Sequence, residues 1–111
     1  MNPYFKSLTM QFLVIARPKA DLAASELSHT FASLLAAEKE KARAFYLDGV
    51  IRQIWDCADT PGVALTFEAS SDEHLQEILN AFPLVAAGCL DLWLIPLKPY
   101  GGFGPLINTA Q

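Results

Sequence analysis

Strand-like and helix-like hydrophobic patterns follow one another along this chain, and their order limits the folds that it can adopt. Four stretches are rich in β-forming residues and show the alternation or the short apolar runs of strands. Two stretches between them repeat apolar residues every three or four positions, as amphipathic helices do. The expected strands are Leu8–Ala16, Val50–Cys57, Val63–Ala69 and Leu90–Leu97. The expected helices are Ala20–Leu47, which Ser28 to Thr30 could interrupt once, and a short one that stops before Pro83.

Residues that favour turns and caps lie where these elements should end. Gly49 is suited to the left-handed conformation that follows the last turn of a helix. The run Asp59-Thr60-Pro61-Gly62 predicts the turn of a hairpin between the second and third strands. Ser70 and Glu73 form a capping-box pattern, so Ser70 is the predicted N-cap of the second helix.

The resulting order β-α-β-β-α-β is the ferredoxin-like pattern, an α+β fold in which two helices cover one face of a four-stranded antiparallel sheet. A chain of 111 residues fits a single domain, 1–111. Residues 97–111 are expected to form an extended C-terminal tail, because Pro, Gly and aromatic residues replace any regular pattern there.

The two faces of the expected sheet differ in composition. The third and fourth strands place a purely apolar set on one face, which should meet the helices: Val63, Leu65, Phe67, Leu90, Leu92 and Leu94. The other face mixes Glu68 and Asp91 with Trp93 and Ile95, which is unusual for a surface in open water. Two such sheets packed face to face would form a dimeric α/β barrel around a partly polar cavity, so we expect a homodimer or larger homo-oligomer. The alternative is an open, monomeric sheet with one tolerated tryptophan.

Charge excludes some classes of partner. The net charge is −4 and the isoelectric point is about 4.9. The basic residues are scattered, and Lys39, Lys41 and Arg43 alternate with Glu38 and Glu40. Proteins that bind nucleic acid usually carry a basic face, so neither nucleic acid nor an anionic membrane surface is an expected partner.

The N-terminal apolar run and the cysteines indicate a cytoplasmic protein. Arg17-Pro18-Lys19 follows the run Leu8–Ala16 without a small-residue cleavage site, so we interpret the run as a strand and not as a signal peptide. No run reaches the length of a membrane span. Two cysteines without CxxC spacing and two distant histidines do not predict a metal site, and reduced thiols are the simplest interpretation: Cys57, Cys89, His29 and His74.

Glu38 is the residue most suggestive of chemistry. Helical geometry places it on the same stripe as Leu27, Phe31, Leu34 and Phe45, so its side chain should point at the sheet. A buried carboxylate has a raised pKa, which suits a general acid or base near neutral pH. The alternative is a structural ion pair with Arg52 or Lys41 at the rim, since such pairs also perturb carboxylates.

Other polar residues could bind a substrate. Arg52 lies inside a strand, where a guanidinium can hold a carboxylate through two hydrogen bonds or form a salt bridge. Glu68 and Asp91 could act as an acid/base pair if their strands were neighbours, although cross-strand ion pairs are the commoner role. Tyr46 could donate a hydrogen bond to a carbonyl, or simply pack in the core.

Several of these motifs resemble the muconolactone isomerase family over residues 36–97. The helix-to-strand segment carries Ala37-Glu38-Lys39-Glu40, then Ala42, then Asp48-Gly49 and Arg52-Gln-Ile-Trp55. The second half carries Ala69-Ser70-Ser71 before a short helix, and Leu79 through Phe82-Pro83-Leu84. The first strand with its Arg17-Pro18-Lys19 turn, and the tail from Pro96 to Phe103, depart from the isomerase pattern and leave the substrate open.

The resemblance implies a fold, an activity and roles for residues. Members are small dimeric α/β-barrel proteins, and the isomerases assemble into larger rings. The family's activity implies a proton shift without a cofactor, on an unsaturated lactone or related carboxylic acid of aromatic catabolism. Glu38 matches a pocket glutamate that would be the acid/base, Lys39 matches the adjacent lysine, and Arg52 and Trp55 match the family's Arg-x-x-Trp strand pattern.

The residues and the resemblance together suggest an isomerase with one catalytic glutamate. Glu38 would remove a proton beside a carbonyl and return it two carbons away, while Arg52 or Lys39 holds a substrate oxygen and the barrel keeps water out. The expected substrate-binding residues are Lys39, Arg52, Trp55, Tyr46 and Trp93. Two other functions fit the sequence. One is a cofactor-free oxygenase of an aromatic substrate. The other is a non-catalytic module for small-molecule binding or structure, with its cavity plugged by the tryptophans and the Tyr100–Phe103 tail.

Overall fold

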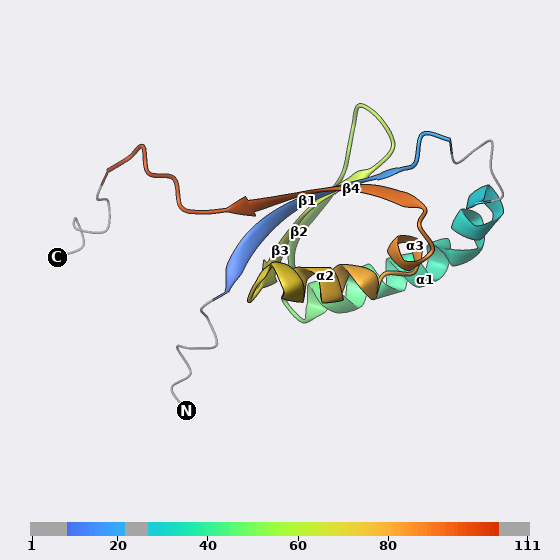
Figure 1. Ribbon diagram of the computed structural model, residues 1–111, viewed down its shortest axis with the longest axis horizontal. Coiled ribbons are helices and arrows are strands. Elements are labelled where there is room, and N and C mark those ends of the chain that lie inside the picture. Colours follow the sequence, from blue (N-terminus) through green and yellow to red (C-terminus); the bar gives the residue numbers. More distant parts are fainter. Residues whose placement is uncertain (1–8, 22–26, 105–111) are drawn as a thin grey trace.

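Four strands form one antiparallel sheet in the order β2-β3-β1-β4, with the helices on one side of it (Figure 1). The computed structural model describes residues 9–21 and 27–104. The elements are β1 Met10–Pro18, α1 Leu27–Leu47, β2 Ile51–Asp56, β3 Val63–Ala69, α2 Asp72–Asn80, α3 Pro83–Ala86 and β4 Leu90–Leu97. The expected ferredoxin-like α+β fold is therefore confirmed.

The strand boundaries agree with the sequence patterns to within two residues, and the helices differ more. The strands β3 and β4 have the predicted bounds, whereas β1 begins at Met10 and continues to Pro18, which still pairs with Leu90. The prediction that α1 starts at Ala20 was wrong, because Ala20 lies in a turn and the described helix runs without a break from Leu27. Residues 22–26 lie outside the described part of the chain.

The prediction that Ser70 caps α2 was wrong by one residue. The N-cap is Ser71, whose backbone is extended and whose hydroxyl accepts a hydrogen bond from the backbone N–H of His74 at 3.0 Å. The backbone N–H of Ser70 instead donates to Nδ1 of the same histidine at 2.9 Å. His74 therefore occupies the position that a glutamate holds in a capping box, but its ring accepts from the residue before the N-cap and not from the N-cap itself.

A short third helix, α3, was missing from the sequence prediction. Pro83 was expected only to end α2, but a proline also fits the first turn of a helix, where the missing N–H would have no partner in any case. It occupies that position in α3. The consequence for the site below is that the buried residue Leu84 lies in the first turn of a helix.

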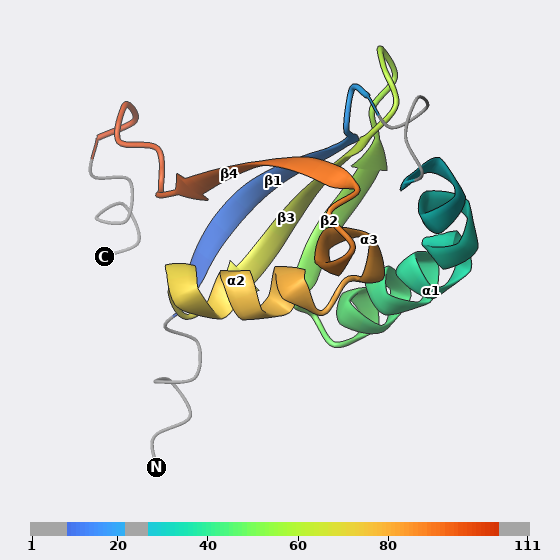
Figure 2. The ribbon, with the colours of Figure 1, turned by 45° about the vertical axis from the view of Figure 1, so that its right-hand side comes forward.

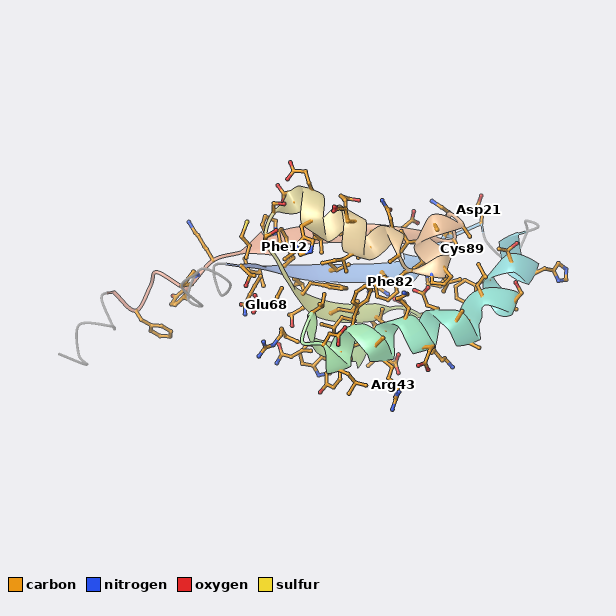
Figure 3. All side chains as sticks on the ribbon, turned by 90° about the horizontal axis from the view of Figure 1, so that it is seen from below. Phe12, Asp21, Arg43, Glu68, Phe82 and Cys89 are labelled. Atoms are coloured by element: carbon orange, nitrogen blue, oxygen red, sulfur yellow. The ribbon has the colours of Figure 1, made fainter. Side chains whose placement is uncertain are left out.

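The hydrophobic core lies between the sheet and the helices, which all lie on one side of it (Figure 2). The core residues are Phe12, Val14, Ile51, Leu65, Phe67, Ala69, Leu75, Ile78, Leu79 and Phe82. Phe82 lies between the α2–α3 layer and α1 (Figure 3), with its ring centroid 5.4 Å from that of Phe45 and 6.4 Å from that of Phe67. Aromatic packing through Phe82 thus connects α1 with β3.

The opposite face of the sheet, here called the open face, is not covered by any helix of the described residues (Figure 2). Pairing across the strands places Leu13 opposite Ile95 and Ile15 opposite Trp93. Directly paired residues share a face, and Trp93 is 50% exposed while Ile95 is 43% exposed. The predicted difference between an apolar helix-facing side and a mixed open face is confirmed.

The tail continues from β4 away from the sheet (Figure 1). Tyr100 and Phe103 pack edge to face with centroids 4.7 Å apart, and both are exposed. Residues 105–111 of the predicted tail lie outside the described part of the chain. No helix within the described residues is long and apolar enough to cross a membrane.

Candidate functional site

A cavity of about 380 Å³ lies between α1 and the helix-covered face of the sheet. Its walls are mainly apolar side chains of the strands and helices, closed at one side by the β2–β3 turn and at another by α3. Three ionisable residues reach it: Glu38, Lys39 and Asp56. We call this space the Glu38 cavity. A largely apolar pocket with a few convergent polar groups is the usual form of a small-molecule site.

The β2–β3 turn can approach the cavity closely because it contains a glycine. Gly62 has φ +147°, and a Cβ atom there would lie 2.7 Å from the backbone oxygen of Ala16. Both the backbone conformation and this contact with β1 exclude an ordinary side chain. The turn therefore packs directly against β1, and Pro61 and Gly62 form part of the cavity wall.

The helical stripe that the sequence predicted carries Glu38 into the cavity. Phe31, Leu35, Glu38 and Ala42 are spaced by four, three and four residues, and all four line the cavity. Glu38 is thus a carboxylate at a position of α1 where the neighbours on the same stripe are apolar. Its exposure is intermediate, so the side chain is partly removed from water without being sealed.

One oxygen of Glu38 is fixed by the first turn of α3. Its Oε1 accepts a hydrogen bond from the backbone N–H of Leu84 at 2.8 Å. The N-cap residue of α3, Phe82, makes no side-chain hydrogen bond to that turn, so a carboxylate from α1 satisfies the N–H instead. Oε2 has no hydrogen bond with any described residue, so this oxygen is free to contact a ligand in the cavity.

Burial raises the pKa of Glu38 above its ordinary value of 4.5, and the hydrogen bond from Leu84 partly opposes the rise. The ion pair with Arg52 or Lys41 that was the alternative for this glutamate does not occur among the described residues, whose ion pairs are Arg17–Asp59, Lys19–Asp91 and Glu40–Arg43. Lys41 instead places its Nζ 5.7 Å from the ring centroid of Phe45. Desolvation, and not a cation, is thus the main influence on this carboxyl.

Asp56, which was not among the predicted site residues, also lines the Glu38 cavity. It ends β2, two positions after Ile54, which also lines the cavity. Because side chains of a strand alternate between faces, the position of Ile54 on the helix-covered face implies the same face for Asp56. The predicted residue Lys39 also lines this cavity, so two of the six predicted site residues share it: Glu38 and Lys39.

The remaining predicted residues lie elsewhere. Arg52, Tyr46 and Trp55 line a second hollow of about 420 Å³ beside the outer edge of β2. We call it the β2-edge hollow. Trp93 lies on the open face, so the sheet separates it from the Glu38 cavity. The structure therefore distributes the predicted site over three places.

Glu68 and Asp91 do not form an acid/base pair, because β1 lies between their strands. Glu68 accepts hydrogen bonds from Thr9 and, at 3.1 Å, from Gln11, and these bonds together with the charge of Arg52 lower its pKa against a smaller opposing effect of desolvation. Asp91 pairs with Lys19 at 3.2 Å. The ion-pair role weighed for these two residues is therefore observed for Asp91, whereas Glu68 accepts hydrogen bonds from neutral side chains. Within residues 9–21 and 27–104, no three His, Cys, Asp or Glu side chains group as metal ligands would.

Comparisons with known proteins agree with this architecture. The sequence matches the family described as muconolactone delta-isomerase over residues 10–102. A solved structure, 5-chloro-2-hydroxyhydroquinone dehydrochlorinase from Burkholderia phenoliruptrix AC1100 in complex with 2,5-dihydroxybenzoquinone, superposes with a TM-score of 0.62 at 16% identity, over 84% of this chain and 98% of that one. Two crystal structures of mutant proteins align with a TM-score of 0.47 at 13% identity, over 90% of this chain and 57% of theirs, a likeness too weak to support an argument. No curated protein matches the sequence significantly.

Proposed function

The chain belongs to the muconolactone delta-isomerase family, and from this premise we propose that it is a cofactor-independent isomerase of a small unsaturated lactone or a related carboxylic acid. One observation carries the proposal. A partly buried carboxyl group, Glu38, enters an apolar cavity with one oxygen held by the N–H of Leu84 and with a raised pKa. A carboxyl whose pKa moves toward neutrality can both take and return a proton at physiological pH.

The proposed reaction needs one base and no added reagent. The Glu38 carboxylate removes a proton from the carbon beside the substrate carbonyl, and the electron pair of that C–H bond delocalises onto the carbonyl oxygen. The conjugated enolate then takes the proton from Glu38 at the carbon two positions away. One C–H bond breaks, another forms and the C=C bond moves, so substrate and product have the same atoms and electrons.

Lys39 is the proposed partner for the developing negative charge. It follows Glu38 on α1 and lines the same cavity, so its ammonium group can approach an oxygen of a ligand bound there. A preorganised cation beside a developing oxyanion lowers the barrier, and it acts more strongly when water is excluded. The apolar walls of the cavity support that exclusion. Arg52, the other cation considered for this role, lines a different hollow.

Replacing Glu38 with Gln is the direct test. We expect turnover of a carboxymethyl-substituted unsaturated five-membered lactone to fall by at least about a hundredfold, as is typical for loss of a general base. Glu40→Gln is the matched control, because this exposed glutamate lies on the same helix and, among the described residues, its side chain pairs only with Arg43. Proton NMR in D₂O follows both the product and the exchange of the proton beside the carbonyl. A Glu38→Gln protein that retains full turnover would refute the proposal.

A second candidate function is chemistry on an aromatic or quinoid ring, including the cofactor-free oxygenase considered above. Three phenylalanines line the Glu38 cavity and could flank a flat ring: Phe31, Phe67 and Phe82. The dehydrochlorinase with the same fold is bound to a quinone, 2,5-dihydroxybenzoquinone. Oxygen uptake or chloride release with hydroxylated aromatic substrates, in place of lactone isomerisation, would favour this candidate.

The non-catalytic alternative receives less support from the geometry. It requires a cavity plugged by the two tryptophans and the tail, together with a glutamate locked in an ion pair. The walls of the Glu38 cavity include none of those plugging residues. The carboxyl of Glu38 is held by a backbone N–H and not by a cation.

The proposed working form is a homodimer or larger homo-oligomer in the cytoplasm. The open face exposes Trp93 by 50% and Ile95 by 43%. Large apolar side chains gathered on one face of a small domain usually mark an interface. The exposed rings of Tyr100 and Phe103 continue the apolar surface past the end of β4. The free thiols of Cys57 and Cys89 are in keeping with a reducing compartment.

A further inference from the structure

The β2-edge hollow has features of a binding site that the isomerase proposal does not use. β2 is an edge strand, and its pairing with β3 is irregular between Ile51 and Gln53. The residue within this irregularity is Arg52. Bulges redirect a side chain, and they are over-represented beside functional sites. The side chain of Arg52 lines the hollow of about 420 Å³ between β2 and the C-terminal half of α1.

We propose that the β2-edge hollow binds a planar aromatic carboxylate, with Arg52 holding the carboxylate and Trp55 and Tyr46 flanking the ring. This site is separate from the Glu38 cavity, and the proposal does not depend on the isomerase activity.

The charge of the hollow is positive. Arg52 has no hydrogen bond or ion pair with any residue in the described part of the chain, although its charge acts through space on Glu68. Arg43 also lines the hollow, and its contact with Glu40 is a long 3.9 Å between side chains that are 69% and 74% exposed. Such surface pairs are weak. Two guanidinium groups are thus available, and a guanidinium matches a carboxylate through two parallel hydrogen bonds.

The aromatic residues favour a ring on the ligand. Trp55 and Tyr46 are each 52% exposed and line the hollow with the two arginines. Exposed rings beside a cationic group can stack on a flat ligand while the cation binds its acid group. The phenolic hydroxyl of Tyr46 is also a donor that can reach a ligand oxygen. Inorganic phosphate would satisfy the arginines but would leave both rings without a partner.

The two sites are neighbours with a shared wall. Ala42 and Ile54 line both the Glu38 cavity and the β2-edge hollow. Every ionisable residue lines only one of the two: Glu38, Lys39 and Asp56 the cavity, and Arg43, Tyr46 and Arg52 the hollow. Variants of one set therefore test one site without removing a charge from the other.

Indole NMR of the full chain tests the proposal directly. The two tryptophans give two Nε1–H signals, which Trp55→Phe and Trp93→Phe assign. We expect benzoate to shift the Trp55 signal saturably, with a Kd on the order of 1 mM for so small a ligand. The Trp93 signal should move much less. Benzamide, which has the same shape without the charge, and inorganic phosphate should both shift Trp55 only weakly.

Substitutions of Arg52 and Lys39 then test whether Arg52 is the cation that binds benzoate. Arg52→Gln should raise the benzoate Kd at least about tenfold, and Arg52→Lys, which keeps the charge but loses the two-pronged geometry, should give a smaller rise. Lys39→Gln is the matched control in the other cavity and should leave the Kd unchanged. The lysine variant serves if the glutamine variant does not fold. An unshifted Trp55 signal, an equal response to phosphate, an unchanged Kd in both Arg52 variants, or a loss of binding in Lys39→Gln would each overturn the proposal.

Discussion

The helix-covered face and the open face of the sheet are built from alternate residues of the same strands, but their surroundings differ. Phe67 of β3 is 1% exposed against the helices, and Trp93 of β4, on the other face, is 50% exposed. The covered face is apolar except at its cavity, which Glu38, Lys39 and Asp56 also line, whereas the open face mixes Glu68 and Gln11 with large apolar side chains. This difference assigns the proposed chemistry to one face and the proposed assembly to the other.

Substitutions of two adjacent residues on β3 should show the largest difference in stability between the two faces. Phe67→Ala should lower the free energy of unfolding by about 3–5 kcal/mol, because it leaves a cavity in the packed core. Thr66→Ala, one residue away and on the open face, removes a hydroxyl that donates to Gln53 at 3.3 Å and should cost about 1 kcal/mol or less. Urea unfolding at one protein concentration measures both. Similar costs for the two substitutions would mean that the faces do not differ in packing.

A charge on the open face should break assembly while leaving the fold intact. Ile95→Glu places a carboxylate at a position that is 43% exposed in one chain and that we propose to be covered by a second copy. Burying an unpaired charge there is costly, so we expect monomers by light scattering and an unfolding midpoint that no longer depends on protein concentration. Gln76→Glu, on the exposed side of α2, is the control and should retain the mass of the unmodified protein. An Ile95→Glu protein of unchanged mass would exclude the open face as the interface.

The carboxylate on the covered face has a smaller, pH-dependent effect on stability. Glu38→Ala should cost about 1–3 kcal/mol, because the N–H of the buried Leu84 loses its acceptor. Glu38→Gln keeps an acceptor of the same shape and should cost much less. Thermal unfolding of both variants between pH 4 and pH 8 separates the loss of the hydrogen bond from the loss of the charge.

The sign of the pH dependence follows from the raised pKa of Glu38. A raised pKa in the folded state means that this carboxyl contributes stability below its unfolded pKa, near 4.5, and that the contribution is lost as pH rises through the folded pKa. Gln does not titrate, so the stability of Glu38→Gln relative to the unmodified protein should increase as pH rises above 4.5. A relative stability that falls over this range would contradict burial as the dominant cause of the shift.

The covered face was the more predictable of the two from sequence, for a physical reason. Alternate side chains of β3 and β4 point to opposite faces, and the apolar set must be the one that the helices cover. Leu65 and Phe67 could therefore be assigned to the core. The same helical stripe that contains Phe31 led to Glu38, and the structure places both in one cavity. Local periodicity was sufficient for these residues because burial repeats along each element.

Residues that depend on how separate elements meet were harder to predict. Arg52 and Trp55 were grouped with Glu38 through the Arg-x-x-Trp pattern of the resembling family, but the structure places them in another hollow. The pairing of β2 with β3 is irregular at Arg52. The short helix α3 supplies the N–H of Leu84 that binds Glu38. Neither feature has a period that could be read from a single sequence, although Asp56 could have been found from its position two residues after Ile54.

Removing the N-cap of α2 should have the smallest effect on stability among these substitutions. Ser71→Ala should lower the free energy of unfolding by about 1 kcal/mol, because the N–H of His74 loses its acceptor. Ser70→Ala should cost less, since the backbone N–H of Ser70 still donates to His74. Because α2 packs on β3 from the covered side only, neither variant should change the oligomeric mass. Equal costs at both serines would restore Ser70 as the cap, and a change of mass would show that the two faces are coupled through β3 and are not independent.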